Sequence, residues 1–361
     1  MKKIVSIIIV FLLGFQLVPI VGQAAENMQY SVKANIPDNQ IDKKLTYFDL
    51  RITPSQKQTI TLIVSNSSDK EETIIISPNV AVTNQNGVID YSKFESKLDS
   101  SFKVPLSSVI SEKQEVTLAA KESKEVSFTL QMPKESFDGI ILGGFYITKK
   151  ESADKKEEEK NVQIKNNYSY VIGIKLRETD VEVKPEIVLN DIQPDLLNYR
   201  TVVTANLQNT KATMIKDLNV TAKVFKKGET TVLHETSKEG MSMAPNSNFD
   251  FPINWDNQPL DAGDYTLQLV AKSGDNEWKF EKDFVIDEKE VKPLNDEAVE
   301  LEKAETNLLL PIILAIVATV ALMAVIFYLL SRHKKKKEAE KKALLRKKKK
   351  KKKKKSKSKN N

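Results

Sequence analysis

The segment VAVTNQNGVIDYSKF, residues 80–94, gathers several polar side chains around one expected turn. Asn86-Gly87 favours a hairpin, because both residue types tolerate positive φ. Amide and carboxylate groups pair with the hydroxyl and acetamido groups of sugars, and a tyrosine ring can stack on a pyranose face. Two interpretations stay open: a tight turn with Gly87 as its structural residue, or the same turn displaying a glycan-binding surface on a rigid scaffold. The candidate glycan-binding residues are Thr83, Asn84, Gln85, Asn86, Asp90 and Tyr91.

Few residues could support catalysis. His234, in TTVLHETS, is the only histidine ahead of the apolar segment near the C-terminus, and its setting is typical of a strand end. The adjacent carboxylates Glu157, Glu158 and Glu159 lie in a charged segment that lacks the apolar surroundings of an acid/base pair. The sequence contains no nucleophile elbow, phosphate loop or zinc-ligand spacing. We therefore predict a non-enzymatic protein with no catalytic residue, cofactor or metal site.

The N-terminus, MKKIVSIIIVFLLGFQLVPIVGQAAE, has the parts of a secretory signal peptide: Lys2 and Lys3, an apolar core, and small residues near Ala24. We expect residues 1–25 to be this signal peptide, and an uncleaved N-terminal anchor is the alternative. The chain has no cysteine, so a lipoprotein anchor is excluded. An exported region without cysteine also points to a bacterial exterior.

A second apolar stretch, LLLPIILAIVATVALMAVIFYLL, covers residues 308–330 and carries no charge. Its length suits a hydrocarbon core about 30 Å thick, so we predict a transmembrane helix. The only Leu-Pro sequence here, LLLPI, lies inside the helix and is not the sorting signal Leu-Pro-x-Thr-Gly. We therefore expect a helix that stays in the membrane and no covalent attachment to the wall.

A Lys-rich tail, residues 331–361, follows the helix at once and holds 19 Lys and Arg against two acidic residues. Positive flanks stay in the cytoplasm, which predicts a single-pass type I protein of the cell membrane with its exterior domains in the wall. The tail should also contact anionic lipid. Nucleic-acid binding is not expected, because no aromatic residue is interleaved for stacking. The candidate membrane-surface residues are Arg332, Lys334, Lys335, Lys336 and Lys337.

The region outside the membrane alternates apolar and polar residues with a period of two. QKQTITLIVSN, KEVSFTLQMP, YSYVIGIKLRE and YRTVVTANLQN all show this pattern. Short strands between turns predict an all-β fold: two tandem immunoglobulin-like β-sandwiches, then a stalk and a single C-terminal transmembrane helix. The expected ranges are 28–150 for the first sandwich, 160–287 for the second and 288–307 for the stalk.

Two details of this organisation can be predicted further. The charged segment KKESADKKEEEKN, residues 149–161, is either a linker or a hairpin loop. We favour the hairpin, because neighbouring strands usually pair; residues 165–178 would then complete the first sandwich. In LDAGDYTLQLV, Gly263 and Tyr265 precede an alternating strand, which predicts the tyrosine corner of immunoglobulin-type sandwiches.

The strand sequences also resemble a known family. YFDLRITPSQKQTITLIVSNSSDKEETIIIS, AVTNQNGVIDY and GIILGGFYI resemble the first domain of the WxL-interacting proteins of Gram-positive bacteria. NYSYVIGIKLRE, VTANLQNT and LDAGDYTLQLVAKSG resemble the second. One departure is Ser55 in TPSQKQ, where the family pattern has glycine after the proline.

The resemblance implies a first domain that binds peptidoglycan, a second that binds host extracellular proteins, and a separate partner protein with Trp-x-Leu motifs. The tryptophans of this chain stand in Trp255-Asp-Asn and Trp278-Lys-Phe, so it would be the interacting member. We thus expect a scaffold for WxL proteins at the cell wall. The alternative is an extracytoplasmic assembly factor, a chaperone for secreted wall proteins, with partners added to an exposed sheet edge.

Overall fold

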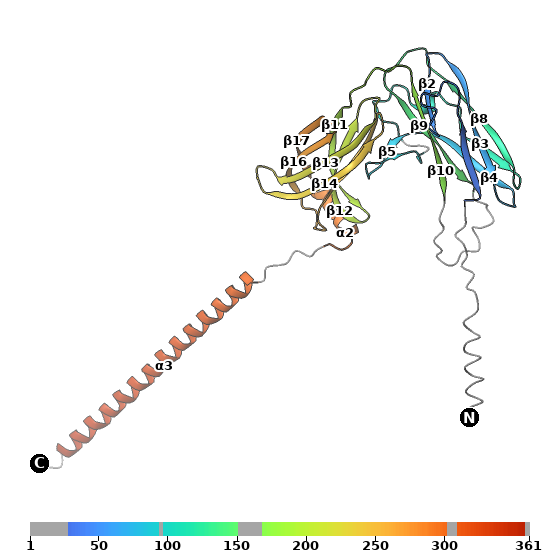
Figure 1. The fold of residues 1–361 in the computed structure, drawn as a ribbon. Coiled ribbons are helices and arrows are strands. Elements are labelled where there is room, and N and C mark those ends of the chain that lie inside the picture. The colour runs from blue at the N-terminus through green and yellow to red at the C-terminus, as the bar shows by residue number, and fades with distance from the viewer. Residues whose placement is uncertain (1–27, 94–96, 151–167, 302–308, 358–361) are drawn as a thin grey trace, which may run out of the picture. The chain divides into compact units, whose positions relative to one another are not determined.

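A computed structural model describes residues 28–93, 97–150, 168–301 and 309–357 (Figure 1). The expected signal peptide and Glu157, Glu158 and Glu159 lie outside the described residues. The chain divides into two compact units, one ending at Leu301 and the other beginning at Glu302. The first unit holds all the strands, and the second holds one long helix.

The first sandwich packs two sheets around one apolar core. Its strands are β1 (Tyr30–Asn35), β2 (Phe48–Arg51), β3 (Lys57–Asn66), β4 (Glu72–Val80), β7 (Gln114–Leu118), β8 (Ser123–Gln131), β9 (Ile141–Lys149) and β10 (Ser169–Arg177). One sheet has the order β1-β3-β8 and the other β2-β10-β9-β4-β7. A short 3₁₀ helix, η2 (Leu106–Ser108), buries Leu106 in the core between them.

The predicted alternation sets the core face of each strand. Ile60, Leu62 and Val64 of β3 are buried, and the residues between them are partly exposed. Successive side chains of a strand point to opposite faces, so only one face of β3 meets the second sheet. Phe145 of β9 and Phe128 of β8 meet in the centre, with ring centroids 4.5 Å apart.

Strand β10 settles how the two modules are joined. It pairs antiparallel with β9 over eight residue pairs, from Ser169↔Thr148 to Leu176↔Ile141, and parallel with β2. Strands β9 and β10 are therefore paired neighbours, as the hairpin prediction requires, and residues 151–167 between them lie outside the described residues. Residues 169–177 belong to the first sandwich.

The second sandwich has seven strands in two sheets. They are β11 (Ile187–Leu197), β12 (Arg200–Asn209), β13 (Ile215–Lys226), β14 (Val232–Met243), β15 (Ser247–Asn254), β16 (Gly263–Ser273) and β17 (Asn276–Ile286). The sheets have the orders β11-β12-β15 and β14-β13-β16-β17, and a second apolar cluster fills the space between them. The all-β fold of two tandem immunoglobulin-like sandwiches is confirmed.

The tyrosine corner is also confirmed. The Tyr265 hydroxyl donates to the carbonyl oxygen of Asp261 at 2.8 Å, four residues upstream. Lys226 Nζ donates to the same hydroxyl at 2.7 Å. The Tyr265 ring is buried between Trp255, at a centroid distance of 5.7 Å, and Phe284, at 5.4 Å. One residue thus ties the entry of β16 to the core.

The segment expected to be a stalk begins as helix α2 (Glu288–Glu297). Val291 and Leu294 pack against the core of the second sandwich. Leu260 N–H donates to Asn295 Oδ1 at 2.9 Å, and Asn295 Nδ2 donates to the Leu260 carbonyl at 3.0 Å. The first half of this segment is therefore part of the second sandwich. Residues 302–308 lie outside the described residues.

The second unit contains helix α3 (Leu309–Lys357). Among the described residues, one helix, Ile313–Lys342, is long and apolar enough to cross a membrane. Its large apolar side chains are exposed throughout, and Phe327 is 76% exposed. Arg332, Lys334, Lys335, Lys336 and Lys337 follow on the same helix with exposed side chains. This distribution suits lipid around the apolar part and water or lipid headgroups around the basic part.

Candidate ligand site between the two sandwiches

The predicted hairpin is present as β5 (Val82–Thr83) and β6 (Ile89–Asp90), which pair antiparallel. Gly87 has a φ of 71°, and its N–H donates to the Asn84 carbonyl at 2.9 Å. Asn86 is not among the residues of positive φ, so only Gly87 uses the left-handed region. The Asn84 side chain accepts from the N–H groups of Asn86 at 2.9 Å and Val88 at 3.1 Å. Asn84 Oδ1 therefore holds the turn together.

The hairpin docks on the second sandwich. The Thr83 and Ser247 hydroxyl oxygens lie 2.5 Å apart, and the Ala244 N–H donates to Thr83 Oγ1 at 3.0 Å. The Ser242 N–H donates to the Gly87 carbonyl at 2.7 Å. Thr83 is buried by this contact. Its hydroxyl therefore serves the junction between the sandwiches and is not displayed on a free loop.

Tyr91 also faces this junction. Its ring packs against the small apolar cluster of Ala81, Leu142 and Ala244. A Cβ added at Gly144 would lie 3.0 Å from the Tyr91 ring, so glycine leaves the ring its space. Burial raises the pKa of the Tyr91 phenol above its ordinary value, and the neighbouring Tyr47 phenol adds to the rise. Much of the ring is thus committed to packing, which leaves less of it for stacking on a sugar.

A second contact between the sandwiches centres on Asp99. Its Oδ1 accepts from Ser101 N–H at 2.8 Å, from the Ser101 hydroxyl at 2.6 Å and from Gln208 Nε2 at 2.7 Å. Its Oδ2 accepts from Asn248 Nδ2 at 2.5 Å. Burial alone would raise the pKa of Asp99. The hydrogen bonds from Ser101, Asn248 and Gln208 together outweigh burial and hold this pKa below its ordinary value.

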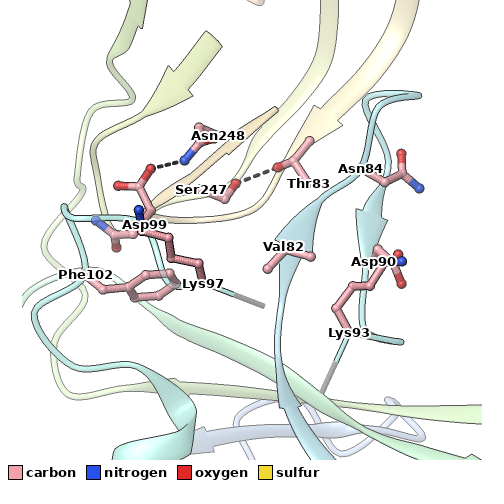
Figure 2. A pocket seen from close by; sticks show the side chains of 11 residues that line it. Val82, Thr83, Asn84, Asp90, Lys93, Lys97, Asp99, Phe102, Ser247 and Asn248 are labelled. Atoms are coloured by element: carbon pink, nitrogen blue, oxygen red, sulfur yellow. Dashed lines mark hydrogen bonds between the residues drawn. The ribbon is translucent and has the colours of Figure 1, made fainter. Parts of the chain in front are cut away.

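These contacts enclose a pocket with a cavity volume of about 260 Å³. Figure 2 shows Val82, Thr83 and Asp90 from the hairpin, with Ser247 facing Thr83 and Asn248 facing Asp99. Side chains from both sandwiches therefore form one site. The lining residues are Val82, Thr83, Asn84, Asp90, Lys93, Lys97, Asp99, Phe102, Asn246, Ser247 and Asn248.

In the pocket wall from the second sandwich, most polar side-chain groups already form hydrogen bonds within the protein. Asn246 Nδ2 donates to the carbonyl oxygens of Ser101 at 3.0 Å and Thr210 at 3.2 Å. Ser247 Oγ donates to the Ala244 carbonyl at 2.9 Å, while Asn248 is paired with Asp99. These groups hold the junction and have little capacity left for a ligand.

The first sandwich supplies the polar groups that remain available. Asn84 uses its Oδ1 in the turn, and its Nδ2 is the donor that it offers to a ligand. Among the described residues, Asp90 accepts one hydrogen bond, from Ser92 N–H at 2.7 Å through Oδ1. Within the described ranges Lys93 and Lys97 form no ion pair, and both side chains are exposed. The site therefore offers two ammonium groups and an amide N–H to an anion, and one carboxylate oxygen to a donor.

The candidate glycan-binding residues thus separate into three places. Asn84 and Asp90 line the pocket, and Gln85 and Asn86 are exposed at the tip of the hairpin. Thr83 also lines the pocket, but its hydroxyl is engaged in the junction, and Tyr91 packs in the junction. The partners in the second sandwich could not be predicted from a local pattern, because 164 residues separate Thr83 from Ser247. Val82 and Lys93, in contrast, lie within the segment 80–94 that had been predicted to carry the site. The lining residues that were not predicted are Val82, Lys93, Lys97, Asp99, Phe102, Asn246, Ser247 and Asn248.

His234 lies apart from this pocket, on β14. Its ring is buried and stacked on Trp255, with ring centroids 4.0 Å apart, and Nδ1 lies 2.9 Å from Oδ2 of Asp256. The imidazole lies between an aromatic face and a carboxylate, so its contacts are those of a residue that stabilises the fold. The described residues contain no group of three metal-ligating side chains close enough to hold an ion.

Fold and site together define a class of protein: a binding protein of two tandem β-sandwiches that carries a single apolar C-terminal helix. Two family models match it in order. The peptidoglycan binding domain of the WxL Interacting Protein matches residues 30–149, and the host binding domain matches residues 159–296. The chain belongs to the WxL Interacting Protein family. The second match starts ahead of β10, a strand that the structure places in the first sandwich.

Solved structures that resemble the chain include several chaperones. The E. coli chaperone DraB is 13% identical, with a TM-score of 0.26, and the match covers 72% of this chain and 97% of that one. The Pseudomonas aeruginosa CupB2 chaperone is 12% identical, with a TM-score of 0.24 and coverages of 66% and 97%. A chain from the Salmonella enterica SafA pilin–SafB chaperone complex is 12% identical, with a TM-score of 0.27 and coverages of 73% and 98%. No curated relative matches the chain.

Proposed function

We propose that this protein is a non-enzymatic scaffold of the cell surface that binds peptidoglycan and holds partner proteins at the wall. The observation that carries the proposal is the order of its parts: a sandwich matching a peptidoglycan binding domain, a sandwich matching a host binding domain, and an apolar helix. The first sandwich contacts the wall, the second contacts proteins, and the helix keeps both at the membrane. The partner at the wall is a protein with Trp-x-Leu motifs.

Wall contact must come from groups that suit a largely neutral glycan. The exported region is acidic overall, because the chain's net charge of +7 includes the strongly basic tail. Bulk electrostatics therefore oppose binding to polyanions such as teichoic acid. Hydrogen bonds from Gln85 and Asn86, which are exposed at the tip of the hairpin, are the proposed means of glycan recognition.

Sedimentation with purified peptidoglycan tests wall binding. The exterior, residues 26–307, contains both apolar cores and is suited to the assay. We expect it to sediment with peptidoglycan sacculi and an unrelated β-sandwich of similar charge to stay in the supernatant. Equal retention of the two proteins would remove the wall-binding part of the proposal.

Deletion of the gene separates scaffold from assembly factor. A lost scaffold should release the Trp-x-Leu partner intact into the medium, because the partner folds without help. Degradation of the partner in the deletion strain would instead point to the chaperone alternative. Immunoblots of the cell and medium fractions for the partner decide between the two.

A further inference from the structure

We propose that the pocket between the sandwiches is a binding site for the carboxylate end of a short peptide, of the kind that cross-bridges and stem peptides of peptidoglycan present. This inference rests on the proposed wall binding and adds a second ligand chemistry to it. The hairpin tip would contact sugar, and the pocket would take the peptide.

Four charged side chains line the pocket. Lys93 and Lys97 line it without an ion pair in the described ranges, and Asn84 is a further lining residue. Asp99 also lines the pocket, but four hydrogen-bond donors already surround its carboxylate. Two lysines and two aspartates line the pocket, so its formal charge is zero, and the two ammonium groups are its partners for an anionic group. A carboxylate is the peptide group that two ammonium groups and an amide N–H recognise best.

The remaining groups suit the rest of a peptide. Asp90 has an oxygen to spare and can accept a peptide N–H or an amine. Phe102 supplies an apolar surface for a small side chain. The cavity of about 260 Å³ is below the range of roughly 300–1,000 Å³ that encloses drug-sized ligands. It has room for one end of a peptide.

Calorimetric titration of the exterior, residues 26–307, tests the site with three probes. They are a synthetic stem pentapeptide with free carboxylates, the same peptide with every carboxylate amidated, and an N-acetylglucosamine oligomer. We expect the first peptide to bind in the pocket and the amidated peptide to bind at least tenfold more weakly. The sugar oligomer reports the hairpin tip independently.

The double variant Lys93→Gln/Lys97→Gln should raise the Kd of the free-carboxylate peptide about tenfold, because it removes both ammonium groups that the pocket offers to a carboxylate. The matched control is Lys33→Gln/Lys57→Gln, which removes the same charge from two exposed positions outside the pocket. Both variants should keep the wild-type melting temperature and sedimentation with sacculi through the sugar contacts.

The outcomes separate the site from the wider function. Equal peptide affinity for the pocket variant and its control, or for the free and amidated peptides, overturns the pocket proposal even if wild-type protein sediments with sacculi. Failure of wild-type protein to sediment removes the proposed function, and the pocket proposal falls with it. Loss of peptide binding in the pocket variant alone supports both.

Discussion

The hydroxyl groups of Thr83 and Ser247 lie 2.5 Å apart, although 164 residues separate them in the chain. One belongs to the hairpin of the first sandwich and the other to the start of β15 in the second. Thr83 Oγ1 also accepts from the Ala244 N–H. Thr83, Ser247 and Ala244 therefore form a small hydrogen-bonded cluster that joins the two sandwiches, next to the pocket proposed to bind peptide.

Thr83→Val should weaken this contact between the sandwiches. Valine keeps the volume but leaves the buried Ala244 N–H without its acceptor, which costs about 1–3 kcal/mol. Urea unfolding of the exterior, followed by tryptophan fluorescence, measures the loss. Thr221→Val is the matched control, because its hydroxyl pairs with Ser237 on an exposed face. A loss no larger than that of the control would contradict the role given to Thr83.

Gly87→Ala should destabilise the docked hairpin for two separable reasons. Any residue other than glycine is strained at a φ of 71°, and the new Cβ would lie 2.5 Å from Met241 Sδ in the second sandwich. Gly228→Ala isolates the first reason, because Gly228 has a φ of 81° and no atom within 4 Å of the added Cβ. We expect about 1–2 kcal/mol at Gly228 and clearly more at Gly87. If the two variants lose the same amount of stability in thermal unfolding, the added Cβ at position 87 does not clash with Met241.

Tyr265→Phe tests the tyrosine corner. The substitution removes the hydrogen bond to the Asp261 carbonyl and the one from Lys226, at an expected cost of about 1–2 kcal/mol. Tyr199→Phe serves as the control, since Tyr199 is 59% exposed. Denaturant midpoints of the two variants give the comparison. An unchanged midpoint for Tyr265→Phe would show that the hydroxyl contributes nothing net.

The contacts of Asp99 should make the junction sensitive to acid. Its folded-state pKa is lowered, so the unfolded chain binds the proton more tightly than the folded chain does. The stabilisation is fully present above the ordinary aspartate pKa of about 3.9 and is lost as the pH falls through the lower folded-state value. Asp99→Asn should lower the melting temperature at pH 7 and reduce its decline between pH 5 and pH 3.

Asp275→Asn is the control for this pH series, because Asp275 lies on an exposed turn. Its melting temperature should follow that of the wild-type protein at every pH. If Asp99→Asn also follows the wild-type curve at every pH, the carboxylate does not hold the junction.

Orientation in the membrane is a separate prediction. Protease added to intact protoplasts should digest the sandwiches and spare a tag placed after Asn361, because the basic flank stays inside. Lysed protoplasts are the control in which both parts are cut. Digestion of the tag together with survival of the sandwiches would reverse the proposed topology.

The strands could be predicted from the sequence, because burying one face of a sheet requires apolar and polar residues to alternate along each strand. The alternation of Ile60, Leu62 and Val64 with polar residues predicts β3, and the spacing of Gly263 and Tyr265 predicts the tyrosine corner. The apolar run of residues 308–330 likewise needs only length and hydropathy. Each of these signals is local: a few neighbouring residues contain all the information.

The site could be predicted only in part. The turn at Gly87 is local and was found, whereas the burial of Thr83 and Tyr91 depends on the second sandwich. Helix α2 was expected to be part of a free stalk, because its acidic sequence gives no sign that Val291 and Leu294 meet an apolar core. In both cases the partner surface is distant in the chain.

The sequence by itself determined the all-β exterior, the two modules and the apolar helix, since periodicity and segment length are properties of the chain alone. Only the tertiary structure decided that the polar hairpin faces a neighbour. Hydrogen bonds such as the one that unites Thr83 with Ser247 form between groups whose sequence separation leaves no pattern to detect. The pocket exists because two folded surfaces meet, and no segment of either one specifies it.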